Sequence, residues 1–391
     1  RDRVEGLYLH WPLCFHKCHY CDFYSIVDSA DRAEPLAARM IDEIQALGGL
    51  IDRPIRTVFF GGGTPTLMPV SLWPKVLDGL AEAFDLSGLT EFTVEANPET
   101  VSAELLQALR AGGVNRLSIG CQSFNERHLK TLERWHNPAG VELAVERARA
   151  AGIGNLNLDL IFAIPGQTLA EWAADLDHAL ALEPTHLSCY GLTYEPNTAM
   201  AAKLTAGRIE RADEQLEAAM YEHTIDRLTA AGFEHYEVSN FALTSRGRQP
   251  ADAPGVTQRP HSEGEGDHEL PLMAHGHRCQ HNLMYWLNGE WLAIGPSASG
   301  HVAGVRWKNL PHLGRYLASA GGAPIEPGSV EQLDADASIG EQLMLRLRLI
   351  EGVEHGWLDS VPSRPSTVGS GPSRKRREAL DELIGRGLLE R

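Results

Sequence analysis

The feature that most restricts the fold is an alternation of short β-rich runs with amphipathic helical patterns over the first 240 residues. Strands are predicted at 7–11, 56–60, 91–96, 115–120, 155–166 and 185–192, with helices at 34–47, 71–84, 102–113, 141–152 and 169–182. Repeated β-then-α units predict parallel strands joined by crossover helices, so the fold class is α/β. The pattern fits a doubly wound sheet or an open, partial barrel, and both place ligands at the carboxyl ends of the strands.

The same patterns divide the chain into three predicted regions. Residues 1–243 form the main domain, ending with a long helix at 212–232 and a β-rich segment at 233–241. Residues 244–278 are rich in Pro, Gly, His and charge and have no apolar period, which indicates an insertion or a long loop. Residues 279–391 include helical patterns at 334–348 and from 374 onward, and predict a smaller domain of mixed α and β character.

Charge and hydropathy limit the classes of function. The formal net charge is −17, which argues against nucleic acid as a partner, because that binding depends on Lys and Arg neutralising phosphates. No apolar run reaches the length of about 18 residues expected of a membrane span, and the first residues show no apolar signal-peptide core. We therefore expect a cytoplasmic protein. The sequence leaves its oligomeric state open.

Three of the six cysteines lie within eight residues, in the stretch CFHKCHYC at 14–21. Cys14, Cys18 and Cys21 have the spacing C-x3-C-x2-C, which indicates metal ligation in a reducing compartment. Three thiolates and a nearby histidine could bind structural zinc. They could equally hold an iron–sulfur cluster that leaves one iron open to a small molecule. The spacing alone does not separate these alternatives.

Polar or glycine-rich positions follow several successive predicted strands. Gly61-Gly62-Gly63-Thr64-Pro65 follows the second strand, Glu95 ends the third, Gln122 ends the fourth and Asp159 lies in the fifth. Each residue taken alone is as readily a turn or surface position. Taken in order, they predict a shared site, because parallel α/β proteins assemble their sites from consecutive strand ends.

These motifs together resemble those of radical S-adenosylmethionine (SAM) proteins. Within that superfamily the chain is similar to the oxygen-independent coproporphyrinogen III oxidase group. The resemblance covers nearly the whole chain outside 244–278 and is carried by YLHWPLCFHKCHYCDF, FFGGGTPTL, VEANPE, RLSIGCQSF, NLDLIFAIPGQT, YEVSNFA and HNLMYW.

The resemblance implies a partial (β/α)6 barrel with a [4Fe-4S] cluster in the loop after the first strand. Cys14, Cys18 and Cys21 would ligate three irons, and SAM would chelate the fourth. By matching position, the resemblance also implies cofactor contacts from Tyr8, Tyr20, Phe23, Gly62, Gly63, Thr64, Glu95, Gln122, Arg134 and Asp159.

Two branches of the group differ at positions that this sequence contains. The oxidase branch has a fourth cysteine two residues after the third, where this chain has Phe23. The other branch, the HemW family of haem chaperones, has phenylalanine there and an H-N-x-x-Y-W motif, which matches residues 281–286. That resemblance implies haem as a further ligand and transfer of haem to an acceptor haemoprotein such as a respiratory enzyme. The resemblance to this branch implies that the chain lacks coproporphyrinogen oxidase activity. It leaves open whether the protein associates peripherally with a membrane.

His281 is the candidate haem contact in this motif, because an imidazole is a common axial ligand of haem iron. Tyr285 and Trp286 would offer flat apolar surface to the macrocycle. In the alternative interpretation, His281 and Asn282 fix the backbone and the aromatic residues belong to the core.

Overall fold

The computed structural model describes residues 4–27, 31–244, 276–353 and 357. In this part of the chain one sheet contains twelve strands, in the order β14-β13-β12-β11-β1-β4-β5-β6-β7-β8-β10-β9. The strands of this sheet are β1 (Val4–Trp11), β4 (Thr57–Gly62), β5 (Glu91–Ala96), β6 (Arg116–Gln122), β7 (Asn155–Phe162), β8 (His186–Gly191), β9 (Phe233–Glu237), β10 (Asn240–Leu243), β11 (Glu290–Ile294), β12 (Ser299–Val302), β13 (Val305–Lys308) and β14 (Glu331–Gln332).

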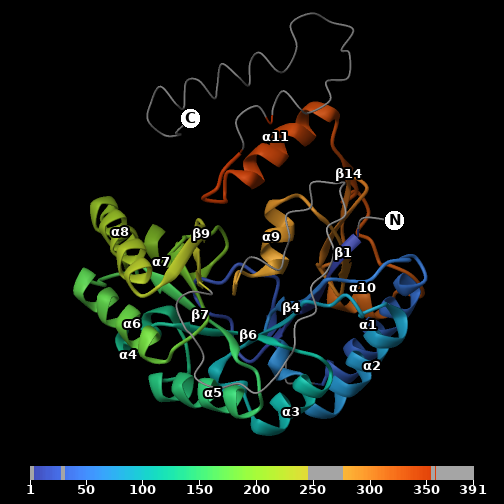
Figure 1. Ribbon diagram of the computed structural model, residues 1–391, viewed down its shortest axis with the longest axis horizontal. Helices are drawn as coiled ribbons and strands as arrows, with labels where there is room; N and C mark the ends of the chain where they lie inside the picture. Colours follow the sequence, from blue (N-terminus) through green and yellow to red (C-terminus); the bar gives the residue numbers. More distant parts are fainter. Residues whose placement is uncertain (1–3, 28–30, 245–275, 354–356, 358–391) are drawn as a thin grey trace, which may run out of the picture.

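Six consecutive strands of the sheet, from β1 to β8, pair in parallel with their neighbours. The connections between and after them carry α1 (Ala33–Gly48), α2 (Trp73–Ala83), α3 (Ala103–Ala111), α4 (Glu126–Leu132), α5 (Pro138–Ala150), α6 (Leu169–Ala181), α7 (Ala199–Thr205) and α8 (Glu214–Ala230). Figure 1 shows the larger helices following one another around the outside of a curved sheet. This is the predicted partial (β/α)6 barrel, and not a sheet covered on both faces. Its strand order is open.

The strand sequences alternate between the two faces of the sheet. In β6, Leu117, Ile119 and Cys121 belong to the hydrophobic core shared with the outer helices. On the other face of β6, Arg116 and Ser118 are polar and buried. Because successive side chains of a strand point to opposite faces, the outer face is apolar and the inner face carries polar groups. The same alternation occurs in β7 and β8.

Local sequence signals fix several helix boundaries. Thr168 and Glu171 form a reciprocal capping box that begins α6. Asn137 caps α5, whose first residue is proline, and Ser102 caps α3. The predicted helices are confirmed within a few residues, while α4 and α7 are short helices that the sequence analysis did not anticipate.

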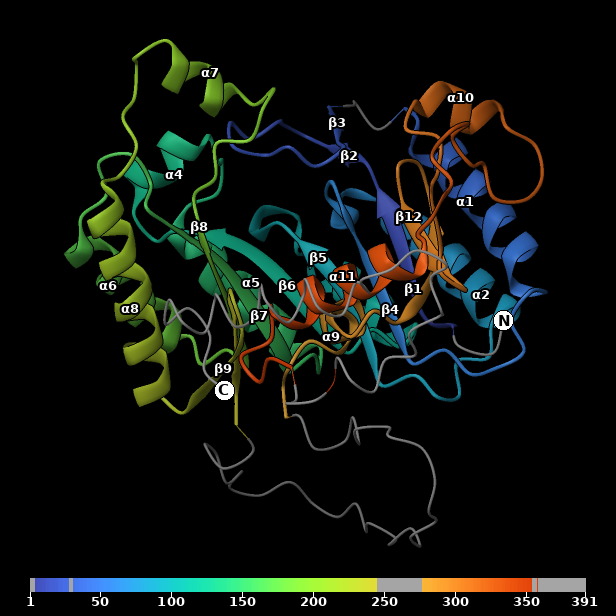
Figure 2. The ribbon, with the colours of Figure 1, turned by 90° about the horizontal axis from the view of Figure 1, so that it is seen from above.

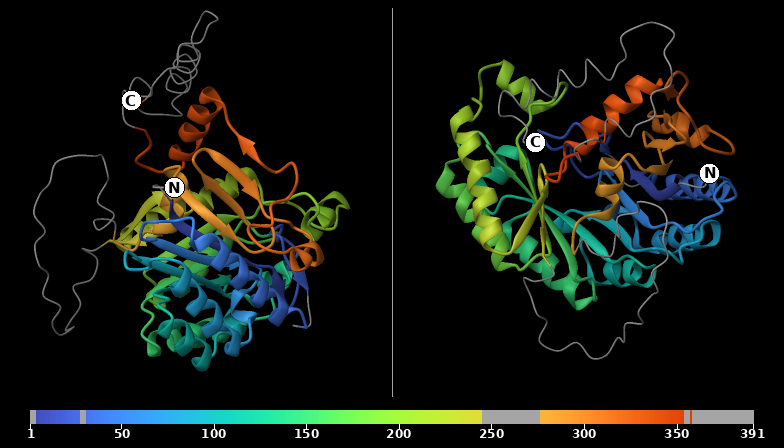
Figure 3. Two further views of the ribbon diagram at one scale, coloured as in Figure 1. Left: turned by 90° about the vertical axis from the view of Figure 1, so that its right-hand side faces the viewer. Right: turned by 45° about the horizontal axis from the view of Figure 1, so that its top comes forward.

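The chain after the predicted insertion continues the barrel sheet. α9 (Gln280–Trp286) leads into β11, which pairs in parallel with β1. β12, β13 and β14 then extend the sheet as an antiparallel meander. The helix α10 (Leu313–Ala318) lies between β13 and β14 in the chain, and α11 (Ala335–Arg346) follows β14. Figure 3 shows these strands beside β1, with α11 above them. The predicted mixed α/β character is therefore observed, in strands that share the main sheet.

Three further points complete the description. The segment predicted as one strand at 233–241 is a hairpin of β9 and β10. The predicted insertion, apart from its ends, and the helix expected from 374 onward lie outside the described residues. No helix in the described ranges is long and apolar enough to cross a membrane.

Candidate functional site

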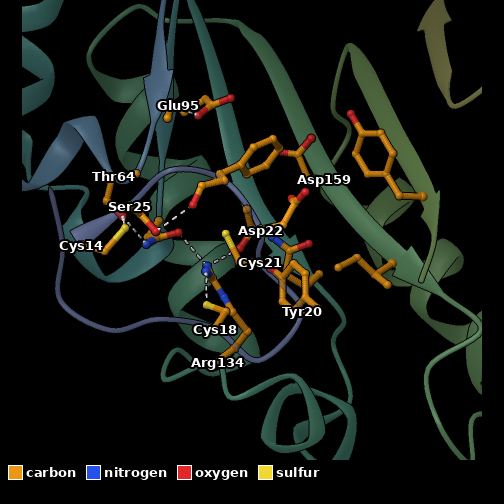
Figure 4. Close-up of a pocket in the computed structure, with 18 of the residues that line it drawn as sticks. Cys14, Cys18, Tyr20, Cys21, Asp22, Ser25, Thr64, Glu95, Arg134 and Asp159 are labelled. Atoms are coloured by element: carbon orange, nitrogen blue, oxygen red, sulfur yellow. Dashed lines mark hydrogen bonds between the residues drawn. The ribbon is translucent and has the colours of Figure 1, made fainter. Parts of the chain in front are cut away.

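A cavity of about 460 Å³ lies at the carboxyl ends of the parallel strands (Figure 4). Most of the residues proposed from the sequence line it together. They are Cys14, Cys18, Tyr20, Cys21, Phe23, Gly62, Gly63, Thr64, Glu95, Gln122, Arg134 and Asp159. The sheet thus brings residues from positions 14 to 159 to one place, as expected for parallel strand ends.

The three cysteines lie in the loop that follows β1. This loop contains the small parallel pair β2 (Leu13–Cys14) and β3 (Ile26–Val27). It crosses the mouth of the barrel toward α4 and α7 (Figure 2). There the backbone N–H of His19 donates to Leu132, and the carbonyl of His19 accepts from Met200. The two hydrogen bonds of His19 therefore anchor the far end of the loop to the segments around α4 and α7.

The thiols themselves have specific neighbours. Cys14 Sγ lies 3.4 Å from Thr64 Oγ1, and Arg134 Nη1 donates to Cys18 Sγ at 3.6 Å. Burial raises the pKa of the Cys21 thiol to about 11 and also raises the pKa of Cys14. Such thiols are protonated at neutral pH and lose their protons on binding iron.

The donor set fits a cluster held by three thiolates. All three thiols line one cavity, and Cys121, Cys189 and Cys279 are buried away from it. In the described ranges no group of three His, Cys, Asp or Glu side chains is arranged to hold a single metal ion. A [4Fe-4S] cluster spans more space than one ion and matches thiols distributed along a cavity wall.

The glycine-rich end of β4 forms another wall of the cavity. Gly62 has φ +110°, and a Cβ there would meet the His10 ring at 2.5 Å. A Cβ on Gly63 would meet the Pro12 backbone at 2.7 Å. Only glycine fits both positions, which leaves the backbone open for close approach by a ligand.

Arg134 connects the cysteine loop to the strand ends. Its Nη2 donates to Asn97 Oδ1 at 2.7 Å and to the Gly120 carbonyl at 2.9 Å. Its Nε is buried and has no hydrogen-bond partner in the structure. A planar guanidinium held in this way can donate hydrogen bonds to a ligand carboxylate in the cavity.

Two carboxylates face the cavity from β5 and β7, the strands on either side of β6. Glu95 accepts a hydrogen bond from the Gly62 N–H at 3.0 Å, and burial, followed by repulsion from Asp159, raises its pKa to about 7. Burial also raises the pKa of Asp159, although hydrogen bonds from Ser118 and Asn157 oppose this shift. The pair can accept hydrogen bonds from the hydroxyl or amino groups of a ligand.

A chain of hydrogen bonds runs from Asp159 into the barrel. Asn157 Nδ2 donates to Asp159 at 2.9 Å, so Asn157 Oδ1 faces His186 Nδ1 at 2.6 Å. His186 Nδ1 must therefore carry the proton, and His186 Nε2 accepts from the Tyr236 hydroxyl at 2.8 Å. The Tyr236 oxygen in turn accepts the backbone N–H of Cys279 at 3.2 Å. The cavity is thus linked to the residue that precedes α9.

Two predicted residues do not line the cavity. Tyr8 lies lower in the barrel, where its hydroxyl is 3.0 Å from His10 Nδ1. His281 is fully buried, and its ring nitrogens pair with the Thr57 hydroxyl at 2.9 Å and the Tyr285 hydroxyl at 2.7 Å. The prediction that His281 contacts haem finds no support in this arrangement, because both nitrogens are already occupied.

The position of His281 corresponds instead to the alternative drawn from the sequence. Glu91, buried inside the barrel, accepts the backbone N–H groups of Gln280 and His281 at the start of α9. The His281 ring stacks on Phe59 at 5.3 Å. The residue therefore fixes α9 against the inner face of the sheet.

Sequence reasoning missed several residues of the cavity wall, among them Ser118, Tyr190, Glu195 and Ser239. Ser118 and Tyr190 occupy inward positions of β6 and β8. The period-two alternation of those strands was a signal that could have identified them. Glu195 and Ser239 lie in loops whose course no local pattern specifies.

Comparisons with known proteins agree with this geometry. The model of the radical SAM superfamily matches residues 8–179. The chain is 36% identical to the haem chaperone HemW of Escherichia coli, covering 98% of this chain and 91% of the relative. It is 35% identical to HemW of Mycobacterium tuberculosis, covering 98% and 88%, and 35% identical to HemW of Lactococcus lactis, covering 90% and 83%.

A solved structure has a similar fold. Coproporphyrinogen III oxidase (HemN) from Escherichia coli, a radical SAM enzyme, superposes with a TM-score of 0.69 at 23% identity. The match covers 89% of this chain and 76% of that protein. At this identity the likeness concerns the fold.

Proposed function

The chain belongs to the HemW family of the radical SAM superfamily, and we propose that it is a haem chaperone that carries a [4Fe-4S] cluster and SAM and passes haem to an acceptor haemoprotein. The observation that carries this proposal is the coincidence of similarity to HemW along the whole chain with a cavity lined by three thiols. Phe23 lies in that cavity at the position that separates the two branches of the group.

The cofactor roles follow from the cavity wall. Cys14, Cys18 and Cys21 would hold the cluster, which supplies an iron without a protein thiolate for the amino and carboxylate groups of SAM. Arg134, which lines the cavity, would pair with that carboxylate, and the glycine end of β4 would let the backbone approach the methionine portion. Glu95 and Asp159 would accept hydrogen bonds from the ligand.

The cellular setting is part of the same proposal. We infer a cytoplasmic protein that meets its acceptor, a haemoprotein such as a respiratory enzyme, directly or at a membrane surface. The names of the relatives support haem as the cargo.

Two assays on one anaerobically reconstituted sample test the proposal. We expect the protein to bind haem while it retains its cluster and SAM. We also expect no conversion of coproporphyrinogen III when a reductant is supplied. Release of CO2 with formation of protoporphyrinogen would instead identify a radical tetrapyrrole enzyme, the competing function that the fold of HemN suggests.

A further inference from the structure

We propose that Asn97 is a positioning residue for the cluster: its amide directs one hydrogen-bond donor onto Cys14 and another onto Cys18, and so raises the reduction potential of a cluster held by these thiolates. This inference rests on the proposed function, since it assumes that the three cysteines of the loop hold a [4Fe-4S] cluster. It adds a residue that was not among the cofactor contacts implied by the resemblance.

Asn97 bridges Thr64 and Arg134 in the wall of the main cavity. It directly follows β5 and precedes the 3-10 helix η3 (Pro98–Thr100). Its carbonyl accepts the backbone N–H of Thr100 at 3.0 Å and the Thr100 hydroxyl at 2.7 Å, which fixes the backbone. Asparagine at the start of a helix commonly uses its side chain as a cap, but this side chain makes no capping bond. The Asn97 amide is committed to the cavity wall instead.

The orientation of the Asn97 amide follows from its two partners. A guanidinium can only donate, so Asn97 Oδ1 must be the atom that accepts Arg134 Nη2 at 2.7 Å. Asn97 Nδ2 is then the atom that faces Thr64, and it donates to Thr64 Oγ1 at 3.0 Å. The amide therefore has one possible direction between the arginine and the threonine.

This direction decides what the Thr64 hydroxyl can do. Its oxygen accepts from Asn97, which leaves its own proton for Cys14 Sγ at 3.4 Å (Figure 4). A cysteine that ligates iron is a thiolate, so Cys14 would be the acceptor. The Thr64 side chain is buried, and little water can reach its hydroxyl. Asn97 thus turns Thr64 into a donor to Cys14.

Arg134 extends the same network to a second thiol. Its Nη2 is held by Asn97 and by the Gly120 carbonyl, and its Nη1 donates to Cys18 Sγ at 3.6 Å (Figure 4). Because the guanidinium is planar, fixing Nη2 also fixes the direction of Nη1. One asparagine therefore orients the donors on two of the three thiols.

These hydrogen bonds act on the chemistry that a cluster would supply. Hydrogen bonds to the sulfur ligands are among the factors that set the potential of an iron–sulfur cluster. Reduction adds negative charge, so a donor on a thiolate stabilises the reduced form more than the oxidised form. The network around Asn97 should therefore make the cluster easier to reduce.

The test is a double-mutant cycle on the cluster-loaded full chain without SAM. Electron paramagnetic resonance during an anaerobic redox titration gives the midpoint potential. Thr64→Val removes the donor to Cys14 and should lower the ratio of reduced to oxidised cluster at a fixed potential about tenfold, which corresponds to about 59 mV for one electron. Thr64→Ser keeps a hydroxyl and should keep the potential. Iron and sulfide analysis shows that each variant holds its cluster.

The second arm of the cycle is Asn97→Asp. Its carboxylate can still accept from Arg134, but it also accepts from the Thr64 hydroxyl, which then no longer donates to Cys14. We therefore expect Thr64→Val to shift the potential far less in the Asn97→Asp background than in the unmodified protein. Comparison within one background removes the direct effect of the added charge.

A matched control and a reserve variant complete the design. Asn125→Asp adds the same charge at the N-cap of α4, outside the cavity, and should keep the potential of the unmodified protein. If Asn97→Asp does not retain its iron, Asn97→Ala takes its place and should lower the potential on its own.

The proposal is overturned if Thr64→Val shifts the potential equally in both backgrounds or shifts it in neither. It is also overturned if Asn97→Ala, used as the reserve variant, leaves the potential unchanged. Failure of the unmodified protein to hold a cluster would instead overturn the proposed function.

Discussion

At the scale of single residues, the account depends first on three thiols. Cys14, Cys18 and Cys21 come from one loop and line one cavity, while Cys121, a residue of β6, is buried in the hydrophobic core. We predict that changing any one of the three to alanine removes most of the bound iron and sulfide after reconstitution. Cys121→Ala should keep both, and iron and sulfide analysis checks this. Full iron content in any of the three variants would contradict the assignment.

Arg134 is the second residue on which the cofactor site depends. Lysine at this position could not hold Asn97, Gly120 and a ligand carboxylate in one plane. We predict that Arg134→Lys weakens SAM binding to the cluster-loaded protein by about tenfold or more, the loss of a charge-assisted bidentate contact. Calorimetric titration measures it. Arg127→Lys, at an exposed arginine outside the cavity, is the matched control and should bind SAM normally. Equal affinities in the two variants would remove Arg134 from the site.

Individual residues also show which parts of the site could be predicted from the sequence and which could not. Twelve of the proposed site residues line the cavity. The cysteines and the strand-end residues carry local signals, whereas Tyr20, Phe23 and Arg134 were proposed from the resemblance alone. That His281 does not line the cavity could not be predicted, because whether an imidazole faces a ligand or the core depends on the packing of α9 against β4 and β1. Nothing in the HNLMYW motif itself records that packing.

At the scale of elements, the chain of hydrogen bonds from Asp159 to Cys279 ties the strands β7, β8 and β9 to the start of α9. Tyr236→Phe would leave His186 Nε2 and the Cys279 N–H without partners inside the barrel. We predict a loss of about 1–3 kcal/mol in the free energy of unfolding, the cost of buried unpaired groups. Tyr221→Phe removes a hydroxyl that bonds at the surface and should cost less. Urea denaturation compares the two.

The protonation of His186 gives an independent check on this element. The chain of hydrogen bonds requires the proton of the His186 ring to be on Nδ1, with Nε2 as the acceptor. Nitrogen-15 NMR of labelled histidine should show that tautomer in the unmodified protein, and the same tautomer in Tyr236→Phe, because Asn157 Oδ1 still accepts the Nδ1 proton. A proton on His186 Nε2 in the unmodified protein would contradict this chain of hydrogen bonds.

Glu43 joins α1 to the C-terminal strands. It accepts hydrogen bonds from the Tyr316 hydroxyl, the Asn309 amide and the Gly295 N–H, and burial raises its pKa to about 7. A folded-state pKa above the ordinary value means that the folded protein binds the proton more tightly. The stabilisation is present at low pH and is lost as the pH rises from about 4.5 to about 7.

We predict that Glu43→Gln flattens this pH dependence by on the order of 1–3 kcal/mol between pH 5 and pH 8. Glu34→Gln, at an exposed glutamate in the first turn of the same helix, should leave the slope unchanged. Denaturation curves at both pH values decide it, and an identical slope in Glu43→Gln and the unmodified protein would contradict the role of this carboxyl.

At the scale of the whole molecule, the β-then-α alternation correctly predicted parallel strands joined by crossover helices, and the resemblance to radical SAM proteins correctly implied the partial barrel. The alternation did not predict that β11 would pair in parallel with β1 and draw the following strands into the same sheet. That pairing joins segments almost 290 residues apart, and no local pattern encodes it. This pairing matters for the site, because α9 contacts β1 and β4 and the cysteine loop directly follows β1.

The central claim is that this molecule delivers haem, and its most direct test is a transfer assay. The full chain, loaded anaerobically with cluster, SAM and haem, is mixed with an apo-haemoprotein of the respiratory type, the two proteins are separated, and the haem on each is measured by its Soret absorption. The account predicts that haem moves to the acceptor and that the cluster stays with the chain. Haem that remains on the chain while the acceptor readily takes up free haem would contradict it.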